Sequence, residues 1–254
     1  MAKIWILRTT RNVRINFSNA WLEKFLVNLS PTGIPKVKGA NASTPTKNNS
    51  QVKKEKRVTE DLSLEPVSEY NKSKMVGERV LLSYKDKIDL TILRPATVCG
   101  YSRRQRLDLV VNILTNHAYN NRKILIFGGD QLRPNIHIKD MVNAYLLFLE
   151  VEKSKISNEI FNVGYYNHPI IELANIVKKS IGNDVKLVTS KTDDMRSYHI
   201  SSNKIFEKLN FKNRYDIKDA VIDLKIAFEK NLFTDPLNNI EYFNIKKMQN
   251  INLK

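Results

Sequence analysis

Tyr70 and Lys74 are the residues whose types and spacing point most directly to chemistry. They lie four apart in the segment YNKSK, and the apolar residues that follow predict a helix over residues 68–85. Residues four apart share one face of a helix. A lysine ammonium beside a phenol stabilises the phenolate and lowers its pKa, so the pair predicts acid–base chemistry at Tyr70. The alternative interpretation is a solvated helical pair without function.

The segments that follow predict an alternation of strands and helices. Short apolar runs predict strands over residues 90–93, 124–127, 135–138, 159–163 and 185–188. Apolar residues at helical spacing predict helices over residues 107–119, 141–151, 170–181, 204–209 and 217–229. Asp140 is expected to cap the helix that starts at Met141. This alternation predicts an α/β fold with a parallel sheet.

The composition fits a packed protein and excludes several other classes. The 254 residues suffice for one large domain with a smaller lobe, and 42% hydrophobic residues exclude wholesale disorder. Cys99 is the single cysteine, so neither an intramolecular disulfide nor a cysteine-based metal site is expected. The four histidines are not spaced as metal ligands, and no metal site is predicted. No apolar run reaches the roughly 18 residues of a membrane span, and the start has no signal-peptide pattern, which predicts a cytoplasmic protein.

The positive charge is concentrated near the N-terminus. Residues 1–60 hold 12 of the Lys and Arg residues but only 3 of the Asp and Glu residues, so they carry just over half of the net charge of +16. Lysine dominates, aromatic residues do not alternate with it, and no zinc-finger or RNA-binding signature is present, so we expect a solvated surface rather than a nucleic-acid partner. The composition of residues 1–52 predicts an atypical basic segment that is linker-like in part.

Beyond residue 52, several motifs follow one another in an order that resembles a known family. The motifs are SEYNKSK, LTILRPATVCGY, FGGDQLRPNIHIKDMVNAYLLFLE, EIFNVG and DDMRSYHISSNKIFEKL. Their succession resembles the extended short-chain dehydrogenase/reductase family, in its nucleotide-sugar epimerase/dehydratase branch. The resemblance covers about residues 53–230, and the combination is far more specific than a lone Tyr-x-x-x-Lys motif.

The resemblance implies a role for individual residues. Tyr70 and Lys74 match the family's catalytic pair, in which the tyrosine takes a proton from a sugar hydroxyl and the lysine holds the ribose of NAD. NADP is the alternative cofactor. Arg94 and Pro95 match the strand end beside the nicotinamide, so the resemblance assigns both to the cofactor site together with the catalytic pair. Arg133 and Arg196 resemble the family's diphosphate- and ribose-binding contacts, and a guanidinium can bind a diphosphate with two hydrogen bonds. Asn112 is a further candidate for the nucleotide-sugar pocket.

The N-terminal part departs from the family pattern. A dinucleotide-binding fold needs a strand, a glycine-rich turn and a helix N-terminus. The candidate first strand, KIWIL at residues 3–7, is followed by RTTRNV, and no three of the eight glycines give G-x-G-x-x-G or G-x-x-G-x-x-G. We therefore expect a Rossmann-like parallel sheet that is incomplete in its N-terminal half, with a smaller C-terminal substrate-binding α/β lobe. Both lie within residues 53–230, and residues 231–254, rich in Asn and Lys, are expected to form a loosely ordered tail.

Two functional hypotheses follow from this combination. In the first, the chain is an enzyme that acts on a UDP- or dTDP-sugar with NAD by hydride transfer. In the second, it is an inactive remnant that binds a nucleotide sugar without the pyrophosphate site for NAD. A parallel sheet that has lost central strands exposes apolar surface, so a homodimer and a separate chain supplying the N-terminal half are the expected protein partners. No membrane partner is expected.

Overall fold

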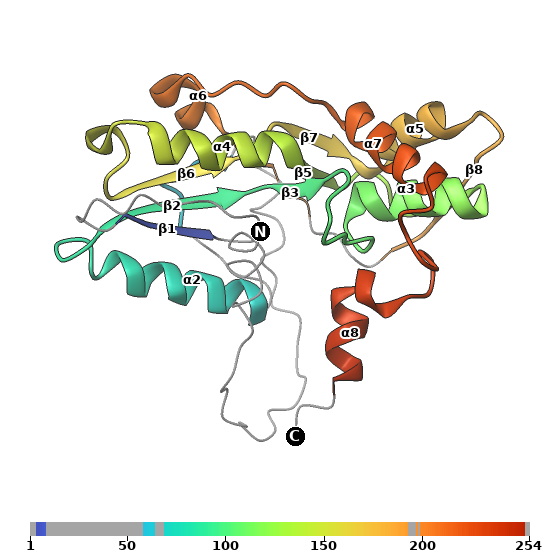
Figure 1. Ribbon diagram of the computed structural model, residues 1–254, viewed down its shortest axis with the longest axis horizontal. Coiled ribbons are helices and arrows are strands. Elements are labelled where there is room, and N and C mark those ends of the chain that lie inside the picture. Colours follow the sequence, from blue (N-terminus) through green and yellow to red (C-terminus); the bar gives the residue numbers. More distant parts are fainter. Residues whose placement is uncertain (1–3, 9–57, 64–68, 193–196, 198, 252–254) are drawn as a thin grey trace.

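Tyr70 lies on the first turn of a helix that covers one face of a small sheet (Figure 1). The computed structural model describes residues 4–8, 58–63, 69–192, 197 and 199–251. Its strands are β1 (Ile4–Arg8), β2 (Asp89–Pro95), β3 (Thr97–Cys99), β4 (Lys123–Phe127), β5 (Leu132–His137), β6 (Glu159–Val163), β7 (Tyr166–Pro169) and β8 (Lys186–Ser190). Its helices are α2 (Glu69–Leu82), α3 (Val110–Asn121), α4 (Ile138–Glu150), α5 (Ile170–Ile181), α6 (Asn203–Leu209), α7 (Ile217–Glu229) and α8 (Asn244–Asn250), and two short 3₁₀ turns are η1 (Lys153–Lys155) and η2 (Ile240–Tyr242).

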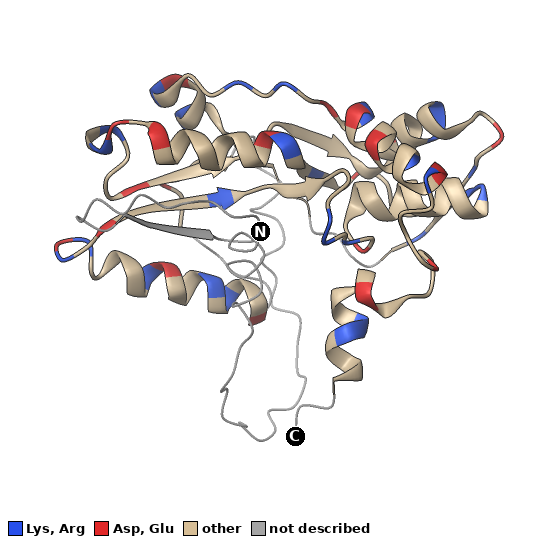
Figure 2. Ribbon diagram, viewed as in Figure 1, with Lys and Arg blue, Asp and Glu red and all other residues tan. Residues whose placement is uncertain are grey.

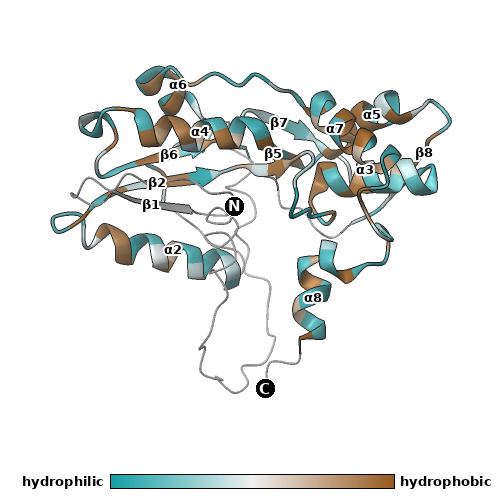
Figure 3. Cartoon of the chain, in the orientation of Figure 1, coloured by the Kyte–Doolittle hydropathy of each residue, from teal (hydrophilic) through white to brown (hydrophobic). Residues whose placement is uncertain are grey.

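The sheet beneath α2 has the strand order β1-β2-β6. β2 and β6 are parallel, with Leu93 beside Phe161, whereas β1 is antiparallel to β2. Figure 1 shows α2 on one face of this sheet and α4 on the other. A strand covered on both faces is buried along its length and mostly apolar. Six consecutive residues of β2, from Leu90 to Pro95, are buried, and Thr91 and Arg94 are the polar residues among them. Helix α4, on the other face of the sheet, carries alternating hydrophobic and hydrophilic residues along its length (Figure 3).

The remaining strands form two further sheets beside the first. One has the order β3-β5-β7 and the other pairs β4 with β8 in parallel. Helices α3, α5 and α7 pack around these strands, and their shared core is built from side chains such as Val111, Leu173 and Val221. The expected α/β fold with parallel strands is therefore confirmed, although β1 pairs antiparallel with β2 and β7 pairs antiparallel with β5. The division into a cofactor part and a substrate lobe stays a prediction.

Helix α4 begins earlier than the sequence indicates and has a different cap. It starts at Ile138, and the ring nitrogen Nδ1 of His137 accepts the backbone N–H of Lys139, so His137 is the N-cap. Asp140, the predicted cap, lies inside the first turn and is fully buried. Its carboxylate instead accepts the backbone N–H groups of Arg214 and Tyr215. The prediction of Asp140 as cap was therefore wrong, because this carboxylate is used by a distant loop.

Residues 231–251 contain more structure than their Asn- and Lys-rich composition indicates. They hold η2 and α8, and two of their phenylalanines, Phe233 and Phe243, are buried. These rings form a core cluster with Leu107 and with the apolar residues of α7. The aromatic residues provide the apolar area that holds this segment in place. Residues 9–52 of the predicted basic segment lie outside the described residues.

Charged residues of both signs lie on the helices of the described part of the chain. Figure 2 shows basic and acidic residues interspersed along α2 and α7. None of the helices in the described part of the chain is long and apolar enough to span a membrane.

Candidate functional site

Tyr70 and Lys74 lie together on the first two turns of α2. The Lys74 ammonium Nζ lies over the aromatic ring, 5.5 Å from the centroid of Tyr70. The Tyr70 side chain is half exposed, with an accessible fraction of 53%. Because α2 runs antiparallel to the strand that follows it, its first turn lies towards the end of β2 (Figure 1). The predicted pair is thus assembled near the carboxyl end of parallel strands, where α/β folds bind their ligands.

The ionisation of Tyr70 differs from the expectation. Burial raises the pKa of Tyr70 above its ordinary value, and the positive charge of Arg106 partly opposes that rise. The predicted lowering of the pKa by Lys74 is not found, and Lys74 lies over the ring face.

Arg94 lies in the interior and ties α2 to β2. Its Nη2 is 2.5 Å from Oε1 of Glu78, and its Nε donates to Oε2 of the same carboxylate at 3.2 Å. Nη1 donates to the backbone carbonyl of Glu60 at 3.1 Å. Both side chains are almost fully buried, so the guanidinium is occupied in holding the helix. A role of Arg94 beside a cofactor stays a prediction.

Pro95 ends β2 beside Val163, the last residue of β6. The segment before α2 is fastened to the same strand end, because Oε1 of Glu60 accepts the backbone N–H of Asn162 at 2.7 Å. The Asn162 side chain in turn donates to the carbonyls of Val58 and Ser201. Pro95 therefore lies at the strand end that the sequence indicates. Its contact with a cofactor stays a prediction.

Asn112 organises the loop between β3 and α3. Its Oδ1 accepts the backbone N–H of Gly100 at 3.0 Å, and its Nδ2 donates to the carbonyl of Arg106 at 2.8 Å. The side chain is buried. Gln105 adds bonds to the carbonyls of the same two residues. Since both ends of the Asn112 amide bind this loop, its predicted contact with a nucleotide sugar stays a prediction.

The two arginines predicted to bind a diphosphate are placed differently. Arg133 is half-buried on β5, beside His168 of β7, and its Nη1 donates to the carbonyl of Leu132 at 3.0 Å. It belongs to the β3-β5-β7 sheet, not to the sheet beneath α2. Arg196 lies outside the described residues. The structure thus brings Tyr70 and Lys74 together and leaves the two arginine roles as predictions.

Sequence reasoning missed Arg106 and Asp108. Nε and Nη2 of Arg106 donate to the two carboxylate oxygens of Asp108, at 2.9 and 3.0 Å. The signal in the sequence is Arg-Leu-Asp at the start of a predicted helix, and this pattern alone does not distinguish a fixed ion pair from surface charges.

Cys99 is a buried residue of the core. Its thiol is buried and donates to the carbonyl of Ile136. Burial raises the pKa of Cys99 to about 12. No group of His, Cys, Asp and Glu side chains among the described residues has the geometry of a metal site.

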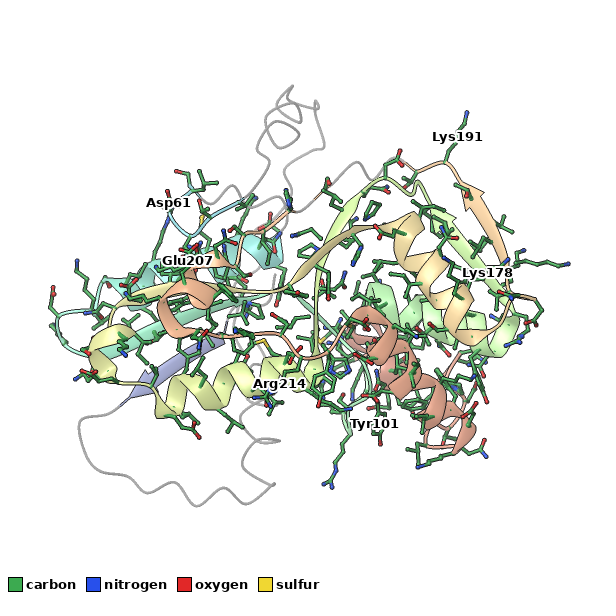
Figure 4. The ribbon with its side chains drawn as sticks, turned by 90° about the horizontal axis from the view of Figure 1, so that it is seen from above. Asp61, Tyr101, Lys178, Lys191, Glu207 and Arg214 are labelled. Carbon is green, nitrogen blue, oxygen red and sulfur yellow. The ribbon has the colours of Figure 1, made fainter. Side chains whose placement is uncertain are left out.

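A cavity of about 570 Å³ lies between residues 59–61 and the start of α6. Figure 4 shows Asp61 and Glu207 at this place, away from Tyr101 and Arg214. Its lining contains neither Tyr70 nor Lys74, so it is separate from the candidate site.

Comparison with known proteins places these features in a family. The model of the NAD dependent epimerase/dehydratase family matches residues 37–164. A UDP-glucose 4-epimerase from Lactobacillus helveticus is 26% identical over 186 residues, which are 65% of this chain and 56% of that protein. A putative UDP-glucose 4-epimerase from Methanocaldococcus jannaschii is 29% identical over 170 residues, or 65% of this chain and 54% of that protein. The chain thus spans little more than half the length of these relatives.

Solved structures show the same similarity. UDP-glucose 4-epimerase from Thermotoga maritima with UDP-glucose has a TM-score of 0.61 and 26% identity, and the match covers 69% of this chain and 58% of that structure. UDP-glucuronic acid 4-epimerase from Bacillus cereus, in complex with UDP-glucuronic acid and NAD, has a TM-score of 0.62 and 25% identity over 71% of this chain and 58% of that structure. The match of the family model over half of the chain, on a fold shared with these enzymes, shows that the chain belongs to the NAD-dependent epimerase/dehydratase family.

Proposed function

We propose that the chain acts on a nucleotide sugar as an NAD-dependent epimerase or dehydratase, with Tyr70 as the group that exchanges a proton with a sugar hydroxyl. The observation that carries the proposal is the Tyr70–Lys74 pair on the first turns of α2. The relatives named for UDP-glucose 4-epimerase activity support the substrate class. NAD, when bound, supplies the acceptor for a hydride from the sugar carbon.

The described residues fit one end of NAD. A half-exposed phenol with an ammonium over its ring offers hydrogen-bonding groups for a ribose and a nicotinamide. Of the three described glycines with positive φ, Gly129 is the most open, because a Cβ there would lie 3.5 Å from Ile171, at ordinary contact distance. Gly100 and Gly128 have positive φ, but a Cβ on Gly100 would lie 3.2 Å from the His137 ring and one on Gly128 would lie 2.3 Å from the Gln131 side chain. Both glycines are therefore already packed against side chains.

We assign the proton transfer to Tyr70 and supporting roles to the charged residues around it. Tyr70 holds the transferable proton on its phenol oxygen, and its half exposure leaves that oxygen accessible to a hydroxyl. Arg106 places positive charge near the phenol, which favours the phenolate when the proton leaves. Lys74 lies over the ring and is assigned to the ribose of the cofactor. Glu78 and Arg94 fix α2 against β2 and so fix the position of Tyr70.

The second candidate function is binding of a nucleotide sugar without turnover. One observation favours it: no three glycines of the given sequence form a glycine-rich turn. In this case Tyr70 and Lys74 would be retained as a binding surface, and the loss of the pyrophosphate site would prevent NAD from binding.

The Tyr70→Phe variant separates the two candidates. The assay is turnover of UDP-glucose with NAD, together with binding of UDP-glucose by calorimetry. Tyr84→Phe is the matched control, because Tyr84 is also half exposed and also has a lysine over its ring, with Lys87 Nζ at 5.8 Å. Turnover that is lost only in Tyr70→Phe, with binding retained, supports the enzyme. Binding without turnover in all three proteins supports the remnant, and no binding in any of them contradicts both.

A further inference from the structure

The cavity between residues 59–61 and helix α6 has the volume of a small-ligand pocket but an unusual lining. It measures about 570 Å³, whereas ligand pockets of roughly 300–1,000 Å³ are mostly apolar. Each described residue of the lining is polar or charged, and the uncharged ones are Thr59, Ser201 and Asn203. Such a lining offers hydrogen bonds and no apolar surface, so it does not fit a nucleobase or an acyl chain.

One wall of the cavity is fixed by backbone hydrogen bonds. The N–H of Val58 donates to the carbonyl of His199, and the N–H of Ser201 donates to the carbonyl of Val58, both at 3.0 Å. Glu60 adds a bond to the sheet, because its Oε1 accepts the backbone N–H of Asn162 at 2.7 Å. The two segments of this wall are therefore held together without a ligand, and a ligand that enters finds hydrogen-bonding groups already in place.

The other wall is one face of α6. Lys204 and Lys208 of this helix line the cavity, but both ammonium groups are already bound to the carboxylate of Glu159 on β6. The Lys204 Nζ lies 2.7 Å from Oε2 of Glu159, and the Lys208 Nζ contacts Oε1. Glu207 lies between the two lysines in the chain and is exposed, and it forms no ion pair within the described part of the molecule. This wall therefore presents a carboxylate whose charge is not neutralised.

The balance of charge selects the kind of ligand. The lining holds three carboxylates against two ammonium groups, and the ammonium groups are paired with a further carboxylate, that of Glu159. Like charges repel at short range, so the carboxylates disfavour an anion and the lysines of α6 disfavour a cation. Carboxylates bind hydroxyl groups strongly, and the hydroxyl and amide groups of the lining both donate and accept. The lining therefore matches an uncharged molecule with several hydroxyl groups.

We propose that this cavity binds a small uncharged polyhydroxyl compound of the size of a monosaccharide. Its hydroxyl groups donate to the carboxylates of Asp61 and Glu207, which belong to the two walls (Figure 4), and accept from the side chains of Ser201 and Asn203. The site is separate from the Tyr70–Lys74 pair, because neither residue belongs to the lining. The proposal therefore adds a second binding site to the proposed function and does not depend on it.

The test is a ligand-observed NMR titration of the full chain with glucose and with glucuronate, which share a ring but differ by one carboxylate. Two variants remove a carboxylate from opposite walls, Asp61→Ala and Glu207→Ala. Glu150→Ala is the matched control, because Glu150 is also an exposed glutamate on a helix, at the end of α4. A further titration with glucose is made in the presence of saturating UDP.

Glucose should bind, and glucuronate should bind about tenfold more weakly because its charge is repelled. Each wall variant should weaken glucose binding by about tenfold, as expected for the loss of a hydrogen bond to a charged group. Glu150→Ala should change the affinity by less than about twofold, which is within surface-charge effects. If Asp61→Ala lowers the thermal midpoint, Glu207→Ala carries the test, because the Glu207 side chain is exposed on the surface of α6.

Several results would overturn the proposal. Glucose that does not bind the native chain, or that binds both wall variants as well as the control, contradicts the site. Glucuronate that binds as tightly as glucose contradicts the charge argument and the choice of ligand. Glucose that is displaced by UDP occupies the nucleotide-sugar site instead of the cavity. The proposed function is decided separately, by turnover and binding of UDP-glucose in the Tyr70→Phe variant.

Discussion

Glu78 and Arg94 form a buried ion pair that joins the helix of the candidate catalytic tyrosine to the strand behind it. Their closest atoms are 2.5 Å apart and both side chains are almost fully removed from solvent. Glu78 lies two turns after Tyr70 on the same helix. Because few other side chains of α2 are buried, this pair is the main fixed point between helix and sheet.

Glu78→Gln should strongly destabilise the protein. The substitution leaves the Arg94 charge buried without its counter-charge, and breaking a buried pair in this way costs about 3–5 kcal/mol. Urea unfolding monitored by circular dichroism measures the loss. Glu69→Gln is the control, since Glu69 pairs with Lys72 on the exposed face of the same helix, and exposed pairs contribute about 0–1 kcal/mol. Equal effects of the two variants would contradict the role assigned to Glu78.

The stability of the protein should fall when His137 is protonated. Burial lowers the pKa of His137 below its ordinary value of 6.5, against the opposing charge of Asp223. A histidine whose pKa is depressed by folding favours the folded state in its neutral form, so its contribution is present above about pH 6.5 and is lost as the pH falls. Protonation of Nδ1 also removes the acceptor that caps α4.

The comparison that isolates this effect is His137→Asn. Asparagine is a good helix cap and does not titrate. Thermal midpoints between pH 7.5 and 5.5 should decrease more steeply for the native chain than for the variant. Parallel curves for the two proteins would show that His137 does not contribute to the acid sensitivity.

Asn112→Ala should loosen the loop that carries Arg106 without unfolding the protein. The variant removes the acceptor of the Gly100 N–H and the donor to the Arg106 carbonyl. Unsatisfied buried groups cost about 1–3 kcal/mol each. Hydrogen exchange of the Gly100 amide should become faster. Asn175→Ala, which removes an exposed bond inside α5, should leave that amide unchanged. Unchanged protection of Gly100 in Asn112→Ala would contradict the assignment.

Phe243→Ala should destabilise the protein by about 3 kcal/mol or more, as for other large-to-small core substitutions. Its ring is buried against Leu107 and Phe233. Ile245→Ala, two residues later, removes a side chain that is 72% exposed and should change stability by less than about 0.5 kcal/mol. Guanidinium unfolding compares the two. A Phe243→Ala effect as small as that of the control would show that the C-terminal segment is not part of the core.

The sequence predicted those elements in which the spacing of the element's own apolar residues decides which of its side chains are buried. Helix α5 begins at Ile170 and ends at Ile181 as expected, because Leu173, Val177 and Ile181 form one buried stripe and Gly182 follows. Asp140 could not be assigned in the same way. A carboxylate near a helix start is a cap by local rules, and only the loop at residues 214–215, far along the chain, makes it a buried acceptor.

The candidate site was predictable only in part for the same reason. The spacing of Tyr70 and Lys74 is a property of one helix and could be recognised directly. The pKa of the phenol depends on burial and on Arg106, which belongs to another part of the chain. The Arg106–Asp108 fork likewise depends on Asn244, which no local pattern connects to it.

The antiparallel strand β1 has a consequence for how the chain is assembled. Ile4 pairs with Leu93 and Arg8 with Asp89, so β1 pairs with a strand that is made more than eighty residues later. β2 in turn needs β6, which ends only at Val163. The entropy of closing such long loops makes these pairings slow. Nascent chains shorter than residue 163 therefore carry unpaired strand edges, and we expect them to depend on chaperones during synthesis.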